Sequence, residues 1–205
     1  HSRHAKENML QSATAASALS EALHDPEPAV RACVASVFEA CLWLNAHNQA
    51  LLCSSTRTVA GLVALLRDQH AARARKHAAA AIGNLVYCSE SSQNTIAQQQ
   101  GAVTGLVSLL QDQHAGVRAT AAAAITSLAS KHVPNQTMIG AMPAAVSGLI
   151  SQLQDSDVGP QAREALRALA SGHVGNWFRI RKQAAGVDVG MLSYILSFTA
   201  SGQSR

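Results

Sequence analysis

LVALLRDQHAARARKHAAAAIGNL, residues 62–85, returns in altered form as LVSLLQDQHAGVRATAAAAITSL, residues 106–128. Both copies contain an apolar run, the tetrapeptide DQHA and an alanine-rich block, in the same order. A phrase of this length that recurs with its internal order intact is the mark of a chain built from repeated structural units. The phrase therefore decides the fold, and the rest of the chain can be aligned on it.

The last leucine of each apolar run marks a constant period along the chain. These anchor leucines are 43, 44, 43 and 43 residues apart, and they are Leu23, Leu66, Leu110, Leu153 and Leu196. A period in this range is typical of α-solenoids, which stack repeats of two or three helices. We therefore predict that this chain stacks helical repeats.

Each repeat has the same internal order. A short segment with an Asn or Gln near its start comes first, followed by a helical run that ends at the anchor leucine. A polar break then carries an aspartate two residues beyond the anchor, and an alanine-rich helix with apolar residues at intervals of three and four closes the repeat. No stretch alternates with a period of two, so we predict an all-α fold without strands.

A known family has this pattern. Residues 92–130 resemble an armadillo repeat over their whole length, and HAAAAIGNLV at 77–86 resembles the third-helix signature of that family. The resemblance implies a right-handed α-solenoid of armadillo-type three-helix repeats, about four and a half in number. We expect a tail at 1–8 and a solenoid at 9–205, with repeats at 9–46, 47–89, 90–130, 131–171 and a partial repeat at 172–205.

The first repeat also has HEAT-like features. HDPEPAVRACVAS, residues 24–36, resembles the HEAT pattern in which an arginine follows an aspartate by six residues. The resemblance implies a ladder between neighbouring repeats, and an arginine can bind a carboxylate and a loop carbonyl together. We assign six residues to this structural ladder: Asp25, Arg31, Asp68, Arg75, Asp112 and Arg118.

In armadillo folds the third helices line the concave face, so the resemblance places a partner-binding groove there. Positions −8, −4, 0 and +3 relative to Asn84 lie on one face of such a helix. The candidate groove residues on this face are Ser36, Trp43, Lys76, Asn84, Tyr87 and Ser127. Aromatic residues are enriched among binding hot spots, so Trp43 and Tyr87 are the candidate anchors. The alternative is that both residues cap the core at a helix end.

One branch of the family has a different groove. Nuclear-import adaptors carry tryptophans at position −4 and asparagines at position 0, an array that holds a basic peptide. Here position −4 holds Ser36, Ala80, Ala123 and Glu164, and of the four repeats only the second keeps the asparagine, as Asn84. This departure argues against binding of nuclear signals.

A second candidate surface is NWFRIRKQ, residues 176–183, which mixes aromatic and basic side chains. Such mixing can bind acidic peptides, RNA or lipid head groups. The alternative is a first helix whose apolar side is buried and whose arginines lie in water. The formal net charge of +4 is too small to indicate nucleic-acid binding by itself. A nucleic-acid-contacting helical-repeat protein that uses the basic residues near 73–76 and 179–182 remains the alternative function.

The four cysteines lack the spacing of a zinc site or a CxxC pair. These are Cys33, Cys41, Cys53 and Cys88. Cys33 and Cys41 lie in one apolar helical stretch, and we expect them to be small buried residues in a reducing, intracellular compartment, the cytoplasm in the first instance. The longest apolar runs are too short to span a bilayer.

No nucleotide-binding, metalloprotease or serine-hydrolase motif occurs, so we expect no catalysis, no cofactor and no metal. The expected function is that of a protein–protein interaction scaffold or adaptor, which binds other proteins along its concave face or at the ends of the solenoid. Residue 1 is not Met, and the last repeat lacks its closing helix. We therefore expect the chain to belong to a longer protein or to a multi-subunit assembly, such as a cytoskeletal or ciliary complex, by analogy with other proteins of this fold.

Overall fold

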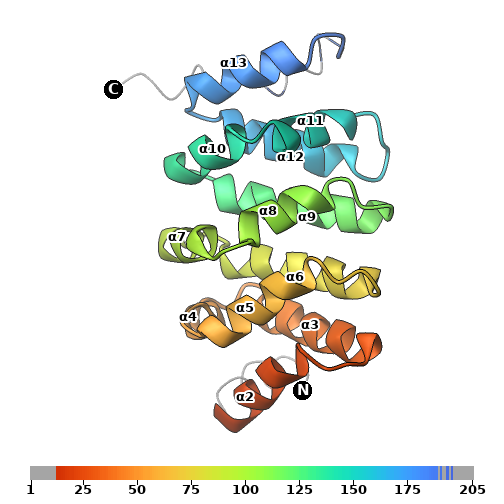
Figure 1. Ribbon diagram of the computed structural model, residues 1–205. Helices are drawn as coiled ribbons and strands as arrows, with labels where there is room; N and C mark the ends of the chain where they lie inside the picture. Colours follow the sequence, from red (N-terminus) through yellow and green to blue (C-terminus); the bar gives the residue numbers. More distant parts are fainter. Residues whose placement is uncertain (1–12, 189, 191–192, 194, 196–205) are drawn as a thin grey trace. The chain divides into compact units, whose positions relative to one another are not determined.

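The computed structural model describes residues 13–188, 190, 193 and 195 (Figure 1). This part of the chain contains α-helices and no strand. The expected tail at 1–8 and the anchor Leu196 lie outside the described residues. Contacts divide the chain into two compact units, unit 1 at residues 1–105 and unit 2 at residues 106–205. The repeat boundaries expected from the sequence stay a prediction.

In unit 1 the long helices are separated by pairs of shorter ones (Figure 1). Its helices are α2 (Ala13–Ala22), α3 (Pro28–Leu42), α4 (Ala46–Cys53), α5 (Thr56–Leu65), α6 (Ala72–Leu85), α7 (Glu90–Gln98) and the first half of α8 (Ala102–Leu109). The long helices α3 and α6 pack against each other, α4 and α5 pack against α6, and α2 packs against α3 and α5. Buried alanines on α6 permit this close packing: Ala74, Ala78, Ala79 and Ala81.

Unit 2 has the same organisation. Its helices are the second half of α8, then α9 (Ala115–Ala129), α10 (Val133–Gly140), α11 (Pro143–Ser151), α12 (Gly159–Ala170) and α13 (Val174–Gln183). The long helices α9 and α12 pack against each other, and α13 packs against α10, α11 and α12. Among the helices of the described ranges, none has the length and apolar character that a membrane span requires.

The anchor leucines Leu23, Leu66, Leu110 and Leu153 are buried, and the first three each face a glycine in the next second helix. A Cβ atom placed on Gly61 would lie 2.8 Å from the Leu23 side chain, and one on Gly105 would lie 2.9 Å from that of Leu66. At Gly148 the closest approach, to Leu110, would be 3.2 Å. A side chain at these positions would push the leucine away, so the glycine permits the helix spacing that the period requires.

The asparagine near the start of the short first helices has a repeated role. Asn48, Asn135 and Asn176 are buried, and each side-chain amide donates a hydrogen bond to the carbonyl seven residues earlier, at 2.9, 3.0 and 2.9 Å. Those carbonyls lie in the last turn of the preceding long helix, where backbone acceptors have no helical partner. The asparagine therefore joins one repeat to the next by satisfying a helix end.

The turn after each long helix contains one residue with positive φ. Leu44, Cys88, Lys131 and Gly172 have φ angles of 52°, 56°, 56° and 71°. This left-handed conformation costs about 1–2 kcal/mol for a residue with a Cβ. Its recurrence at three non-glycine positions indicates that the packing of the flanking helices imposes the turn.

The prediction that Cys33 and Cys41 are buried is confirmed for Cys41 and wrong for Cys33. Cys41 is buried and Cys53 is half-buried, but Cys33 and Cys88 are exposed. Cys33 lies on the opposite side of α3 from the buried Ala35 and Phe38, and Cys88 lies in the turn just described. The sequence could not predict that Cys33 is exposed and Cys41 buried, because alanine and cysteine occur on both faces of this helix.

We expect the substitution Gly105→Ala to lower the free energy of unfolding by about 1–3 kcal/mol, because the new methyl group overpacks the Leu66 side chain. Chemical denaturation monitored by circular dichroism measures the effect. Gly175→Ala is the matched control, since this exposed helical glycine would place its methyl group no closer than 3.4 Å to any neighbour. An equal effect of the two substitutions would contradict the tight leucine–glycine contact.

Candidate partner-binding surface

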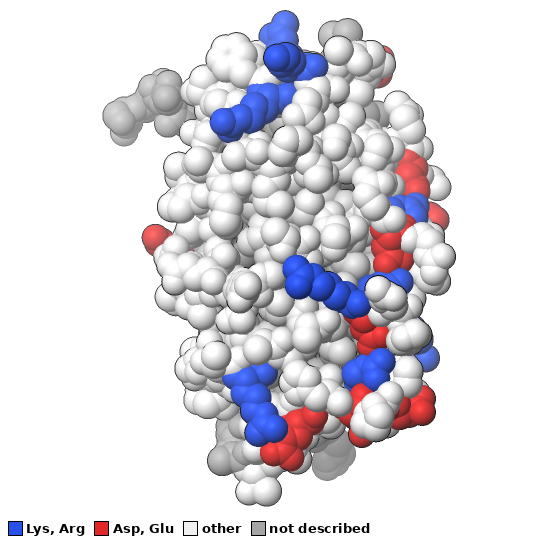
Figure 2. All heavy atoms as spheres, viewed as in Figure 1, with Lys and Arg blue, Asp and Glu red and all other residues white. Residues whose placement is uncertain are grey.

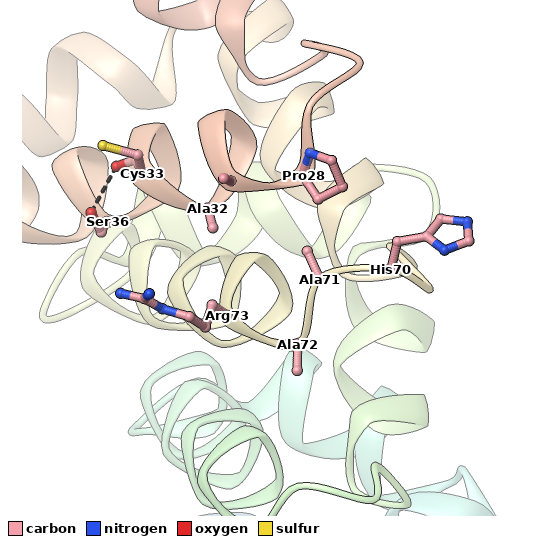
Figure 3. Close-up of a pocket in the computed structure, with 9 residues that line it drawn as sticks. Pro28, Ala32, Cys33, Ser36, His70, Ala71, Ala72 and Arg73 are labelled. Atoms are coloured by element: carbon pink, nitrogen blue, oxygen red, sulfur yellow. Dashed lines mark hydrogen bonds between the residues drawn. The ribbon is translucent and has the colours of Figure 1, made fainter.

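The long helices α3 and α6 of unit 1 enclose a hollow near their first turns (Figure 3). Its volume is about 410 Å³, within the range of roughly 300–1,000 Å³ that is common for binding pockets. The nine residues that line it are Pro28, Ala29, Ala32, Cys33, Ser36, His70, Ala71, Ala72 and Arg73. Most of these side chains are small, so the backbones of the two helices lie close to any occupant.

The hollow has a one-sided charge. His70 and Arg73 are its residues with basic side chains, and none of the nine lining residues is a carboxylate. Both residues are exposed. Figure 3 shows Arg73 on α6 and Cys33 and Ser36 on α3, where the Ser36 hydroxyl donates a hydrogen bond to the Cys33 carbonyl. An anionic group at the mouth of the hollow would therefore meet a cation and no opposing carboxylate from its walls.

Further along the same two helices, polar side chains connect α3 to α6. His77 Nδ1 lies 2.6 Å from Glu39 Oε2, and the Asn84 amide donates a hydrogen bond of 3.0 Å to the Glu39 carbonyl. Asn84 is half-buried and Lys76 is exposed. Asn84 was predicted as a groove residue, and the structure shows that one of its amide hydrogens binds the neighbouring long helix.

The two candidate aromatic anchors lie at the far ends of these helices and are open to solvent. Trp43 is 64% exposed and Tyr87 is 47% exposed. Trp43 is the C-cap residue of α3 with an extended backbone, and Tyr87 follows the C-cap of α6. Both side chains therefore expose much of their surface, and their role as anchors for a partner stays a prediction.

The predicted ladder residues of unit 1 lie together. Arg31 Nε donates a hydrogen bond of 2.7 Å to Asp68 Oδ2, and Arg31 Nη1 donates to the carbonyls of Asp25 and Pro26 at 2.7 and 2.9 Å. Arg75 Nη1 donates to the Asp68 carbonyl at 2.6 Å. The side chains of Arg31 and Asp68 are only 15% and 6% exposed, so this ion pair is better shielded than a surface pair.

Unit 2 contains the equivalent arrangement. Arg118 donates to the Asp112 carbonyl at 3.0 Å, to Gln152 Oε1 at 2.9 Å and to Asp155 Oδ2 at 2.7 Å. The Asp112 carboxylate accepts the backbone N–H of His114 at 2.9 Å. The DQHA phrase therefore forms a turn whose aspartate accepts a backbone N–H two residues later, as Asp68 does with His70 at 2.9 Å.

These contacts shift the ionisation of both aspartates. Burial raises the pKa of Asp68, but the hydrogen bond from Arg31 and those from backbone N–H groups outweigh burial, and the net pKa is below the ordinary value. The backbone N–H of Asp157 is the main cause of a lowered pKa at Asp155, followed by the Arg118 guanidinium. The hydrogen bond to Asp68 raises the pKa of Arg31.

The basic and aromatic residues of α13 form a separate surface in unit 2. Trp177 packs edge-on against Phe178 with ring centroids 5.0 Å apart, and the Arg181 guanidinium lies 5.1 Å from the Trp177 ring centroid. Ile180 is buried, as expected for a first helix, but Phe178 is 63% exposed. Figure 2 shows basic side chains over α13, whereas much of the face drawn carries no charged residue.

Within the described residues, no group of three or more His, Cys, Asp or Glu side chains is placed to hold a metal ion.

Three solved structures of designed armadillo repeat proteins are similar to this chain. One has a TM-score of 0.79 and 23% sequence identity over 93% of this chain and 84% of its own. Another, in complex with the peptide (KR)4, has a TM-score of 0.77 and 22% identity over the same shares, 93% and 84%. The third comes from computationally designed armadillo repeat proteins for modular peptide recognition, with a TM-score of 0.78 and 24% identity over 92% of this chain and 82% of that one.

The chain has an armadillo-repeat fold. The sequence prediction of an all-α armadillo-type solenoid is confirmed by these structures. No protein-family model matches the chain, and no curated protein matches it. The likeness therefore concerns the fold, and the partner has to be inferred from the surface of this chain.

The armadillo long helices of unit 2 present a different surface from those of unit 1. The positions equivalent to Trp43 and Tyr87 hold Ser130 and Ser171. Ser127, the predicted groove residue on α9, is half-buried, and Glu164 on α12 pairs with Arg167 at 2.6 Å. The exposed aromatic pair therefore belongs to unit 1.

Sequence reasoning missed two features of the unit 1 surface. The Glu39–His77 contact joins residues 38 apart, fewer than the repeat period, so alignment of the repeats does not bring them together. Arg73 lies three residues before the first groove position, Lys76, and the hollow that it lines could not be predicted from the sequence. The sequence showed the recurring asparagine, but it did not predict the hydrogen bond from its side chain to a carbonyl at the end of the preceding helix.

We expect Asp68→Asn to lower the free energy of unfolding at neutral pH by about 1–3 kcal/mol, because it leaves the Arg31 guanidinium without its carboxylate. A lowered folded-state pKa stabilises the fold above the unfolded value of about 4, and this stabilisation is lost as the pH falls through the folded-state pKa. Denaturation at a series of pH values should show a smaller loss of stability on acidification for the variant than for the wild type.

The matched control for this experiment is Asp157→Asn, which changes an exposed carboxylate in the turn before α12. We expect this variant to keep the stability of the wild type within about 0.5 kcal/mol. A variant Asp68→Asn that is as stable as the wild type at neutral pH would show that the ladder contributes nothing to folding.

Proposed function

We propose that this chain is a non-catalytic scaffold that binds an extended segment of a partner protein along α3 and α6. The observation that carries the proposal is the exposed pair Trp43 and Tyr87 on the same two helices as the hollow. Large exposed aromatic residues are favourable anchors, because their burial on binding contributes much of the affinity.

The dimensions of the surface fit a short peptide. Cys33 in the hollow and Trp43 are ten residues apart on α3, which corresponds to about 15 Å of helix. An extended chain covers about 3.3 Å per residue, so four or five residues reach from one to the other. A peptide of about eight residues is therefore long enough to occupy the hollow and contact Trp43.

The designed armadillo proteins support this proposal, since one of them is in complex with a peptide and others are described as designed for modular peptide recognition. By the same analogy of fold, we propose that the chain works inside a larger intracellular assembly, of which cytoskeletal and ciliary complexes are the first to consider.

A second candidate function is nucleic-acid binding by α13. Arg179, Arg181 and Lys182 are exposed next to the ring pair Trp177 and Phe178, and single-stranded nucleic acids bind surfaces of this chemistry. Affinity for a labelled single-stranded RNA that falls steeply with salt, and that is lost in Phe178→Ala, would favour this candidate.

The test of the scaffold proposal is selection of binding peptides from a random library, followed by affinity measurements on the selected peptides. We expect Trp43→Ala to weaken binding at least tenfold, because it removes a large apolar contact. Phe178→Ala is the matched control, since Phe178 is 63% exposed, close to the 64% of Trp43, but lies in unit 2. If the selected peptides bind the variants Trp43→Ala and Tyr87→Ala as tightly as they bind the wild type, this surface is excluded as their binding site.

A further inference from the structure

The hollow between α3 and α6 carries an inference about the chemistry of the partner, which rests on the proposed scaffold function. Its walls combine small, mostly apolar side chains with one exposed guanidinium, that of Arg73 (Figure 3). A second cation, Lys76, is exposed three residues further along α6, and residues three apart lie on the same side of a helix. The hollow therefore adjoins a pair of cations.

Neither cation has an ion-pair partner among the described residues, in contrast to the arginines of the ladder. Arg31 and Arg118 each bind an aspartate, whereas Arg73 and Lys76 extend from α6 without one. The difference is informative because the fold engages its ladder arginines in structural contacts and leaves these two cations available. Two adjacent unpaired cations raise the electrostatic potential at this place.

The nearest carboxylates along α3 do not cancel this charge directly. Glu27 precedes the hollow and caps the helix by accepting the N–H of Ala29, and Glu39 follows it and contacts His77. Both carboxylates have contacts of their own, and neither lines the hollow. An acidic partner residue at the hollow would gain the attraction of Arg73 and Lys76, whereas a basic residue there would be repelled.

We propose that the partner segment is acidic and inserts an apolar side chain into this hollow, with a carboxylate next to it that pairs with Arg73 and Lys76. The apolar side chain is required by the lining of Pro28, Ala29, Ala32, Ala71 and Ala72. The small lining residues also let the peptide backbone approach the helices closely. This preference is opposite in charge to the (KR)4 peptide of the designed armadillo neighbour.

The proposal is tested with three fluorescein-labelled octapeptides of alternating sequence: Glu-Leu, Glu-Ser and Lys-Leu. Fluorescence anisotropy measures their affinity for the full chain. We expect the Glu-Leu peptide to bind most tightly, the Glu-Ser peptide to bind more weakly because it has no apolar side chain for the hollow, and the Lys-Leu peptide to bind least.

The charge-reversal variant Arg73→Glu/Lys76→Glu should weaken binding of the Glu-Leu peptide at least about tenfold and should strengthen binding of the Lys-Leu peptide. The matched control is Arg181→Glu/Lys182→Glu, which reverses two exposed cations on α13 and changes the net charge equally. The control should leave both affinities within about twofold. All four positions are exposed, so the variants should fold, and circular dichroism checks this.

Three outcomes would overturn the acidic preference: tighter binding of the Lys-Leu peptide by the wild type, an unchanged affinity in the reversal variant, or an equal loss in the control variant. If the Lys-Leu peptide binds the wild type most tightly and its binding disappears in Trp43→Ala, the scaffold function is supported and only the acidic partner is rejected. If none of the three peptides binds, the inference about the hollow is wrong. The selection of peptides from the random library then tests the scaffold function separately.

Discussion

The contact between an anchor leucine and a glycine of the next second helix is the constraint on which the repeat architecture depends. At Gly61 and Gly105 a Cβ atom would overlap the leucine side chain of the preceding repeat. Because glycine has no Cβ, its helix approaches the anchor leucine to van der Waals distance. The long helices that pack beside these segments adopt the same spacing. Successive leucine–glycine contacts are therefore one repeat apart, which gives the period of 43 or 44 residues between anchor leucines.

Polar contacts add specificity to this apolar packing. The buried asparagines and the ladder arginines both bind backbone carbonyls at the ends of helices or in the turns between them. Each of these groups would be costly to leave unpaired once the helices have packed. They therefore select one register of the repeats rather than supply most of the stability, which comes from the buried leucines and alanines.

The long helices have few large side chains in their exposed positions, so any irregularity in them is a candidate for function. Unit 1 contains three such irregularities on α3 and α6: the hollow, the unpaired cations beside it, and the aromatic residues Trp43 and Tyr87. An apolar pocket, a charged rim and aromatic anchors are the ordinary components of a peptide-binding site. Their presence on neighbouring helices links the armadillo fold to the proposed binding of an acidic segment.

The sequence alone determined the helical class, the repeat period and the armadillo resemblance, because these follow from leucine spacing and from periodicity along a single chain. It also related Asp25 to Arg31, six residues later, because the two residues are close neighbours in the chain. The tertiary structure decided what depends on two repeats at once: the Arg31–Asp68 ion pair, the contact of Glu39 with His77, and the hollow at Arg73. It also decided which cysteines are exposed. These features arise where side chains from different helices meet, and the rotation of one helix against another is set by packing rather than by the residues of either helix.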